Sequence, residues 1–127
     1  MKLIFLVFIG GAIGAIGREL FMQWTPAGFD GFPLDILLAN LLACLLLGLA
    51  AAVHARGRLS DPQYLFIGTG VMGGLSTFSS FAYGAVVLMS GALQGTLVAI
   101  AYVLVSMVLG YLAVLAGQKL GGGGHAA

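Results

Sequence analysis

The residues best suited to chemistry lie in one stretch, Gly73 to Phe81, which reads Gly-Gly-Leu-Ser-Thr-Phe-Ser-Ser-Phe. It falls where a membrane span is expected, yet glycines and hydroxyl residues are poor choices for a helix that faces lipid. Irregular backbone at membrane depth is tolerated only where it is buried in protein or lines a polar cavity. We therefore predict a broken helix near Gly73–Thr77 and place the functional centre there.

A broken helix frees backbone groups that can bind an ion. Carbonyls that lose their helical donors suit a hard cation such as sodium, whereas freed N–H groups suit an anion. Phe78 and Phe81 are three residues apart and share one helix face, where their electropositive ring edges could meet a small anion. Aromatic packing explains the same spacing, so both interpretations stay open.

Further polar side chains interrupt apolar sequence. Asn40 needs a polar partner, because burying an amide without one costs about one to several kcal/mol; it either joins helices or lines a pore. Ser79 and Ser80 stand between the two phenylalanines, and Tyr102 and Ser106 form an i, i+4 hydroxyl pair. Such hydroxyls can also bond back to the carbonyl four residues earlier. Together they favour a polar path through the membrane.

The elements that must position these residues are membrane spans. Of the 127 residues, 61% are hydrophobic and 7% are charged, whereas a soluble domain carries roughly a quarter charged residues. Between Asp61 and Lys119 lie 57 uncharged residues, which is room for two spans of about 20 residues and a turn. Two more uncharged runs complete a prediction of four spans, at about Leu3–Met22, Leu34–His54, Gln63–Met89 and Gln94–Gln118.

We expect one four-helix transmembrane domain at residues 1–118 and a flexible glycine-rich tail at 119–127. The apolar start is interpreted as a retained first helix, because its apolar stretch continues past the length of a signal peptide. Within it, Gly10 and Gly14 are spaced to let another helix approach closely. Basic residues favour the side that carries both termini by four to one, which indicates that this side is cytoplasmic.

The sequence contains no nucleophile–base set, phosphate-binding loop, dinucleotide fingerprint or metal-ligand cluster, so it predicts no enzyme. A formal net charge of +1 without a basic stripe gives no reason to expect nucleic acid. The single cysteine, Cys44, cannot form an intrachain disulfide and is interpreted as a small packing residue. Arg18 either pairs with neighbouring Glu19 or attracts anions at a vestibule.

Three segments, in the same order, resemble the small bacterial fluoride channels (Fluc, also called CrcB). Gly10–Arg18 is similar to that family's glycine-rich first helix ending in arginine. Asn40, followed by Gly48, resembles its second-helix asparagine motif. The third segment, Gly73–Phe81, is similar to the family signature of paired glycines, two hydroxyl residues and Phe-Ser-Thr-Phe, and it is the most specific of the three.

The resemblance implies an antiparallel, dual-topology homodimer in the bacterial inner membrane, with two fluoride pores and a structural sodium ion on the two-fold axis. It implies that the backbone carbonyls of Gly73 and Ser76 hold the sodium. A passive channel would let fluoride leave the cytoplasm after hydrogen fluoride has entered and dissociated. The implied fluoride pathway comprises Asn40, Phe78, Phe81, Ser79, Ser80, Tyr102, Ser106 and Arg18.

Two other classes of protein fit a small four-span chain. A proton-coupled multidrug exporter needs a carboxylate inside the membrane, and Glu19 is the only candidate. An accessory subunit of a larger complex would not need the broken third helix. Fluoride efflux, proton-coupled cation efflux or no efflux from liposomes separates the three classes.

Overall fold

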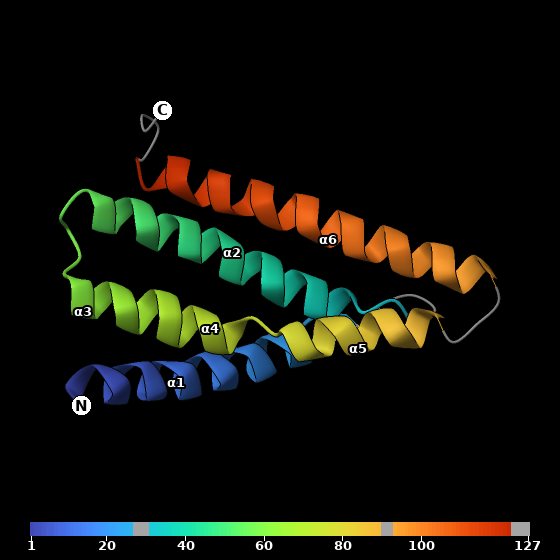
Figure 1. Ribbon diagram of the computed structural model, residues 1–127, viewed down its shortest axis with the longest axis horizontal. Coiled ribbons are helices and arrows are strands. Elements are labelled where there is room, and N and C mark those ends of the chain that lie inside the picture. The colour runs from blue at the N-terminus through green and yellow to red at the C-terminus, as the bar shows by residue number, and fades with distance from the viewer. Residues whose placement is uncertain (27–30, 90–92, 123–127) are drawn as a thin grey trace.

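The computed structural model describes residues 1–26, 31–89 and 93–122, and all regular secondary structure in these residues is helical (Figure 1). Four stretches are long and apolar enough to cross a membrane, which confirms the prediction of an all-α protein with four spans. The helices are α1 (Lys2–Trp24), α2 (Leu34–Ala55), α3 (Asp61–Tyr64), η2 (Leu65–Val71), α4 (Met72–Leu75), α5 (Phe78–Met89) and α6 (Leu93–Leu120).

The helix ends lie close to the predicted ones. The first helix runs from Lys2 to Trp24, and the last continues to Leu120, two residues beyond the predicted end of the domain at residue 118. The turn expected between the third and fourth spans covers residues 90–93, of which 90–92 lie outside the described residues, as do residues 123–127 of the predicted tail. The start of α1 and the end of α6 lie at the same end of the bundle, on the left in Figure 1.

The third candidate span, Asp61–Met89, consists of successive helical pieces. A π-helical stretch, η2, leads into α4, which ends at Leu75. Ser76 then has extended backbone, with φ −78° and ψ 156°, and α5 begins at Phe78. Figure 1 shows this change as the yellow coil before α5. The two glycines of the predicted interruption, Gly73 and Gly74, are themselves helical, because α4 includes both.

Glycines bring two pairs of spans into backbone contact. A methyl group on Gly14 would collide with the carbonyl oxygen of Val71, and one on Gly10 would lie 2.7 Å from the carbonyl oxygen of Phe66. The predicted close approach at Gly10 and Gly14 is therefore confirmed, and it joins α1 to η2 and α4. Gly74 completes this contact from the other side, because its Cβ would collide with the carbonyl oxygen of Gly11.

The second and fourth spans form the other pair. Cβ atoms on Gly48 and Gly117 would collide with backbone carbonyls of the opposite helix, so α2 and α6 also pack at backbone distance. Between the two pairs lies a small core of Ala43, Met72 and Leu75. The sequence therefore builds this bundle on small residues, as is usual for helices that associate in lipid.

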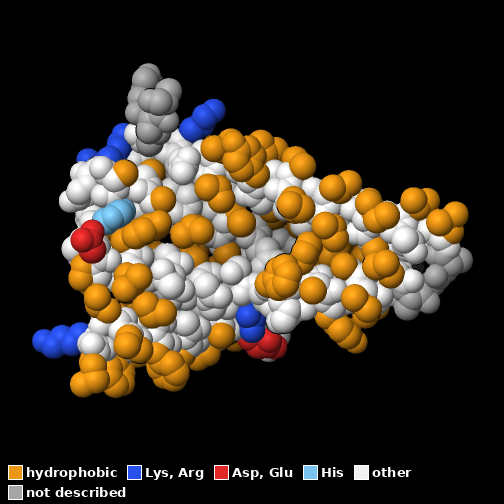
Figure 2. All heavy atoms as spheres, in the orientation of Figure 1, with side chains coloured by type: hydrophobic (Ala, Val, Ile, Leu, Met, Phe, Trp, Pro, Cys, Tyr) orange, Lys and Arg blue, Asp and Glu red, His pale blue; other side chains and the backbone are white. Residues whose placement is uncertain are grey.

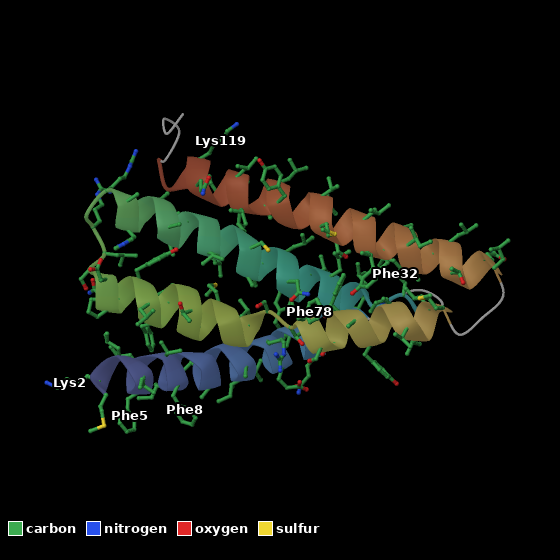
Figure 3. The ribbon with its side chains drawn as sticks, viewed as in Figure 1. Lys2, Phe5, Phe8, Phe32, Phe78 and Lys119 are labelled. Carbon is green, nitrogen blue, oxygen red and sulfur yellow. The ribbon has the colours of Figure 1, made fainter. Side chains whose placement is uncertain are left out.

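The outer surface is apolar along the spans. The side chains of Phe5, Phe8 and Met107 are 65–75% exposed, and Figure 3 shows Phe5 and Phe8 pointing away from the bundle. Figure 2 shows hydrophobic side chains spread over the visible face, with most of the visible basic ones at the end where α1 begins and α6 ends. Such a surface suits lipid rather than water.

Candidate functional site

The side chain of Asn40 on α2 holds the backbone of Thr77 at two points. Its Oδ1 accepts the N–H of Thr77 at 2.7 Å, and its Nδ2 donates to the carbonyl of Thr77 at 3.2 Å. Thr77 is buried, with 7% of its surface exposed. Asn40 therefore satisfies backbone that has left helical geometry, which accounts for an amide among leucines and alanines.

The hydrogen bonds around Thr77 use backbone N–H donors that a continuous helix would direct to its own carbonyls. In an uninterrupted helix the N–H of Thr77 would donate to the carbonyl of Gly73, but it donates to Asn40 instead. Likewise, the N–H of Ser80 would reach the carbonyl of Ser76, but it donates to the Thr77 hydroxyl at 3.2 Å. The carbonyls of Gly73 and Ser76 thus lose their usual helical partners.

Arg18 takes part in the same region from α1. Its Nη1 donates to the carbonyl of Gly74 at 3.1 Å. A cation at the C-terminal end of a helical segment satisfies a freed carbonyl and interacts favourably with the helix dipole. This contact differs from both interpretations of Arg18, the surface pair with Glu19 and the free charge at a vestibule. The guanidinium has further N–H donors beyond the one that this contact uses.

The Thr77 hydroxyl starts α5. It accepts the N–H of Ser80, donates to the Ser80 hydroxyl at 3.0 Å, and lies 3.4 Å from the Ser79 hydroxyl. This is the arrangement of a helix N-cap, in which a side-chain oxygen accepts from the third helical residue. Ser79 and Ser80 therefore lie beside the extended backbone at the start of α5.

A groove of about 260 Å³ opens beside this backbone. It lies between α2, α5, α6 and the Ser76–Thr77 connection, so distant parts of the sequence form its wall. Most of its lining is apolar, with an amide and several hydroxyls in between. The lining residues are Asn40, Cys44, Ser76, Thr77, Phe78, Phe81, Ser106 and Met107.

Aromatic rings border the groove on the α5 side. The centroids of Phe78 and Phe81 lie 6.1 Å apart with the rings tilted by 41°, and Phe81 lies 5.2 Å from Tyr102. Phe32 meets Tyr102 edge to face at 5.4 Å. Phe78 is 81% exposed, so this chain alone leaves one side of the groove uncovered.

The two hydroxyls of α6 have different surroundings. Ser106 lines the groove, but its Oγ donates to the carbonyl of Tyr102 at 2.6 Å, which is the back-bonding that the sequence left open. While that bond persists, the Ser106 oxygen can only accept a further hydrogen bond, and an acceptor repels an anion. Tyr102 is 1% exposed, and its hydroxyl has no hydrogen-bond partner among the described residues.

The structure brings most of the predicted site residues together. Asn40, Phe78, Phe81 and Ser106 share the groove, and Ser76 joins them. The remaining ones lie next to it: Tyr102 behind Phe81, Ser79 and Ser80 at the Thr77 hydroxyl, Arg18 at Gly74, and Gly73 in the exposed part of α4.

Three lining residues were not among the predicted ones: Thr77, Cys44 and Met107. Thr77 could have been found, because a threonine directly before an apolar helical run is a preferred N-cap. Cys44 had a weaker indication, since it lies one helical turn after Asn40 and shares its face. Met107 had no distinguishing pattern among the apolar residues of α6.

Comparison with known proteins agrees with the resemblance seen in the sequence. Residues 5–118 match the family described as "CrcB-like protein, Camphor Resistance (CrcB)". A relative from Brucella abortus biovar 1, named fluoride-specific ion channel FluC 1, is 57% identical over 121 residues, which are 95% of this chain and 45% of the relative. FluC 3 from Yersinia pseudotuberculosis is 46% identical over 94% of this chain and 89% of its own length.

A third relative, a fluoride-specific ion channel FluC from Thermus thermophilus, is 37% identical over 92% of this chain and 91% of its own length. The chain spans less than half the length of the Brucella relatives it matches. With four helices able to cross a membrane, it is a multi-pass membrane protein. The family match over nearly the whole chain, with relatives covered almost end to end, shows that the chain belongs to the CrcB family.

Proposed function

We propose that this chain forms a fluoride-selective passive ion channel that lets cytoplasmic fluoride leave the cell across the bacterial inner membrane. The relatives are named fluoride-specific ion channels, and channels are not enzymes. The functional unit is an antiparallel homodimer with two pores and a central structural sodium ion. We assign these activities to the four-helix domain at residues 1–118 and none to the tail at 119–127.

The observation that carries the proposal is the groove beside Thr77. Fluoride is small and strongly hydrated, so a pathway must offer closely spaced donors in place of water. The groove is lined by Asn40, Ser76 and two phenylalanines among mostly apolar side chains, so an amide, a hydroxyl residue and two aromatic rings are close enough together to meet one small anion. A few donors in a mostly apolar wall favour a small anion over a large organic ion.

The exporter alternative is not favoured. It requires a carboxylate in the binding site that exchanges protons with the cargo. Glu19 is exposed on α1, its Oε1 lies 3.5 Å from the side-chain amide of Gln23, and it is not among the groove lining residues. Fluoride, by contrast, needs no carboxylate on its path.

A second copy of the chain supplies what one copy lacks. The ring of Phe78 is 81% exposed and the groove is open on one side. Gly73 is exposed as well, and beyond its own helical turn a Cβ placed on it would meet no atom of the described residues within 4 Å. A partner packed over α4 and α5 would cover both positions, and an antiparallel partner would supply the inverted symmetry that a four-helix chain without internal repeats lacks.

The sodium proposal rests on the diverted donors. The carbonyls of Gly73 and Ser76 lose their helical N–H partners to Asn40 and Thr77, and freed carbonyl oxygens are ligands that a hard cation accepts. We propose that these carbonyls from two copies hold the ion, whose charge offsets their dipoles in a dry site. Among the described residues no group of three His, Cys, Asp or Glu side chains comes together, so backbone oxygens are the ligands to test.

Proteoliposomes that contain only this chain test the transport proposal. We expect them to release fluoride passively, without a proton gradient and without comparable release of chloride. Liposomes without protein provide the background, and a proton ionophore in both samples separates passive flow from proton coupling. Release of an organic cation driven by protons, or no release above background, would refute the channel.

A pair of variants tests the sodium and dimer proposals separately from transport. Because Gly73 has open space in this chain, Gly73→Val should fold as a monomer and lose the dimer and the sodium. Ser76→Ala keeps its backbone carbonyl and should keep both. Metal content of the purified protein and its mass in detergent report the two outcomes. An intact sodium-loaded dimer in Gly73→Val would refute this arrangement.

A further inference from the structure

The backbone carbonyls around the break in the third span are of two kinds. Those of Gly73 and Ser76 lose their helical donors to Asn40 and Thr77. The carbonyl after each of them is held by a side chain from another span: Arg18 Nη1 donates to Gly74 at 3.1 Å, and Asn40 Nδ2 donates to Thr77 at 3.2 Å. Each proposed sodium ligand is therefore followed directly by a carbonyl that α1 or α2 holds.

Arg18 reaches Gly74 because α1 packs against α4 at backbone distance. A Cβ on Gly74 would collide with the carbonyl oxygen of Gly11 and would lie 2.8 Å from the backbone nitrogen of Ala15. Arg18 follows Ala15 by three residues and so lies on the same face of α1. Figure 1 shows α1 running alongside α4. The close approach that glycine permits thus brings the guanidinium to the end of α4.

The Gly74 carbonyl needs this donor. In a continuous helix it would accept the N–H of Phe78, but α4 ends at Leu75 and Ser76 is extended, so Phe78 begins a separate helix. Arg18 is part-buried in this contact. Among the described residues the ion pair is between His54 and Asp61, so no carboxylate competes with Gly74 for the guanidinium.

We propose that Arg18 is a positioning residue for the sodium site rather than a contact of fluoride. By holding the carbonyl of Gly74, Arg18 fixes the last turn of α4. This also limits the neighbouring peptide that carries the Gly73 carbonyl, because the two peptides share the Gly74 Cα. Asn40 acts in the same way on Ser76 through Thr77. The inference rests on the proposed sodium site and names the side chain that holds its first ligand in place.

Positioning and charge predict opposite effects on sodium. A guanidinium near a sodium ion repels it, so if charge alone mattered, removing Arg18 would tighten sodium binding. If Arg18 holds the backbone, removing it weakens sodium binding although the repulsion is gone. A general loss of stability would lower the unfolding temperature at every sodium concentration without changing the concentration that gives half of the sodium-dependent stabilisation.

Thermal unfolding of the purified full chain in detergent measures sodium binding without measuring transport. Sodium chloride is replaced stepwise by choline chloride, so that the ionic strength stays constant. We expect half-maximal stabilisation of Arg18→Met to need at least tenfold more sodium, because methionine has no donor for the Gly74 carbonyl. A tenfold change corresponds to about 1.4 kcal/mol, which a hydrogen bond from a charged group can supply.

Two further variants complete the test. Arg18→Gln has an amide two bonds shorter than the guanidinium, so it should also lose the contact, and it takes the place of Arg18→Met if that variant does not fold. Glu19→Gln is the matched control, because it removes one charge from the adjacent residue, whose contact is with Gln23 rather than Gly74. It should change the sodium requirement less than twofold.

Fluoride efflux from proteoliposomes gives a second measurement. Arg18→Met should release fluoride more slowly than the parent at low sodium, and excess sodium at constant ionic strength should restore its efflux. A sodium requirement that is unchanged or lower in the Arg18 variants, or efflux that excess sodium does not restore, would overturn the positioning role alone. A parent protein whose stability does not depend on sodium would refute the sodium site itself, and the role of Arg18 with it.

Discussion

Replacing Asn40 by aspartate separates the two roles that the structure allows this residue. The amide holds the backbone of Thr77 at two points and also lines the groove. Asn40→Asp keeps an acceptor for the N–H of Thr77 but loses the donor to its carbonyl, and it adds a negative charge beside the pathway. Asn40→Ala loses both hydrogen bonds and adds no charge.

If Asn40 lies on the pathway, Asn40→Asp should lower fluoride flux more than Asn40→Ala does, whereas Asn40→Ala should lower stability more than Asn40→Asp does. A carboxylate about 5 Å from a fluoride ion repels it by about 3 kcal/mol at an effective dielectric of about 20. That barrier corresponds to a flux reduced roughly 200-fold. Losing the donor to a part-buried carbonyl costs about 1–3 kcal/mol of stability, and Asn40→Ala, which loses both bonds, should be the less stable of the two variants.

Fluoride efflux from proteoliposomes and thermal unfolding in detergent measure the two effects on the same preparations. If Asn40 lies on the pathway, Asn40→Asp conducts far less than Asn40→Ala even though it is the more stable protein. If Asn40 serves only as a clamp, flux follows stability and Asn40→Ala conducts least. Near-normal flux in Asn40→Asp would remove the side chain from the pathway altogether.

The aromatic rings, the helix contacts and the chain ends each allow a further test. Phe78→Ile and Phe81→Ile should each slow fluoride efflux by removing the electropositive ring edge. Only Phe81→Ile should lower the unfolding temperature, because Phe81 packs on a buried tyrosine and Phe78 is exposed. If both variants release fluoride like the parent protein, the rings serve only for packing. Gly74→Ala should unfold the bundle because its Cβ collides with α1, whereas Gly17→Ala, with open space around it, should fold normally as judged by circular dichroism; a folded Gly74→Ala would show that the helices can separate. Cysteine labels at the chain ends should react from both sides of the membrane in comparable amounts, and labelling from one side only would exclude the antiparallel dimer.

The four spans could be predicted from the sequence because they depend on composition alone. An uncharged stretch of 57 residues between Asp61 and Lys119 has few other uses in a folded chain. The packing role of Gly10 and Gly14 could be predicted as well, since small residues four apart on a span favour close helix contact. Their partner could not, because nothing in the pattern indicates that Val71 rather than a residue of α2 or α6 would lie opposite.

The same limit explains why the interruption was predicted to begin too early. Glycine weakens a helix, so Gly73 and Gly74 were the natural place to expect the chain to leave helical geometry. In the structure Gly74 is instead required for contact with α1, and the helix continues through both residues. The extended backbone begins at Ser76. From there on, the Asn40 side chain and the Thr77 hydroxyl accept N–H groups that would otherwise donate to helical carbonyls.

The Thr77 hydroxyl is close in sequence to the group that it binds, whereas the Asn40 amide is distant, so only the role of Thr77 could be predicted from a local pattern. The hydroxyl of Thr77 acts three residues away, on Ser80, so its role follows from a known capping pattern. The amide of Asn40 acts across 37 residues, and only the packing of α2 against the third span brings it to Thr77. Both contacts are needed to free the carbonyls of Gly73 and Ser76. The proposed ion site of backbone oxygens therefore has no local sequence pattern of its own, and from sequence it could be proposed only through resemblance to a family.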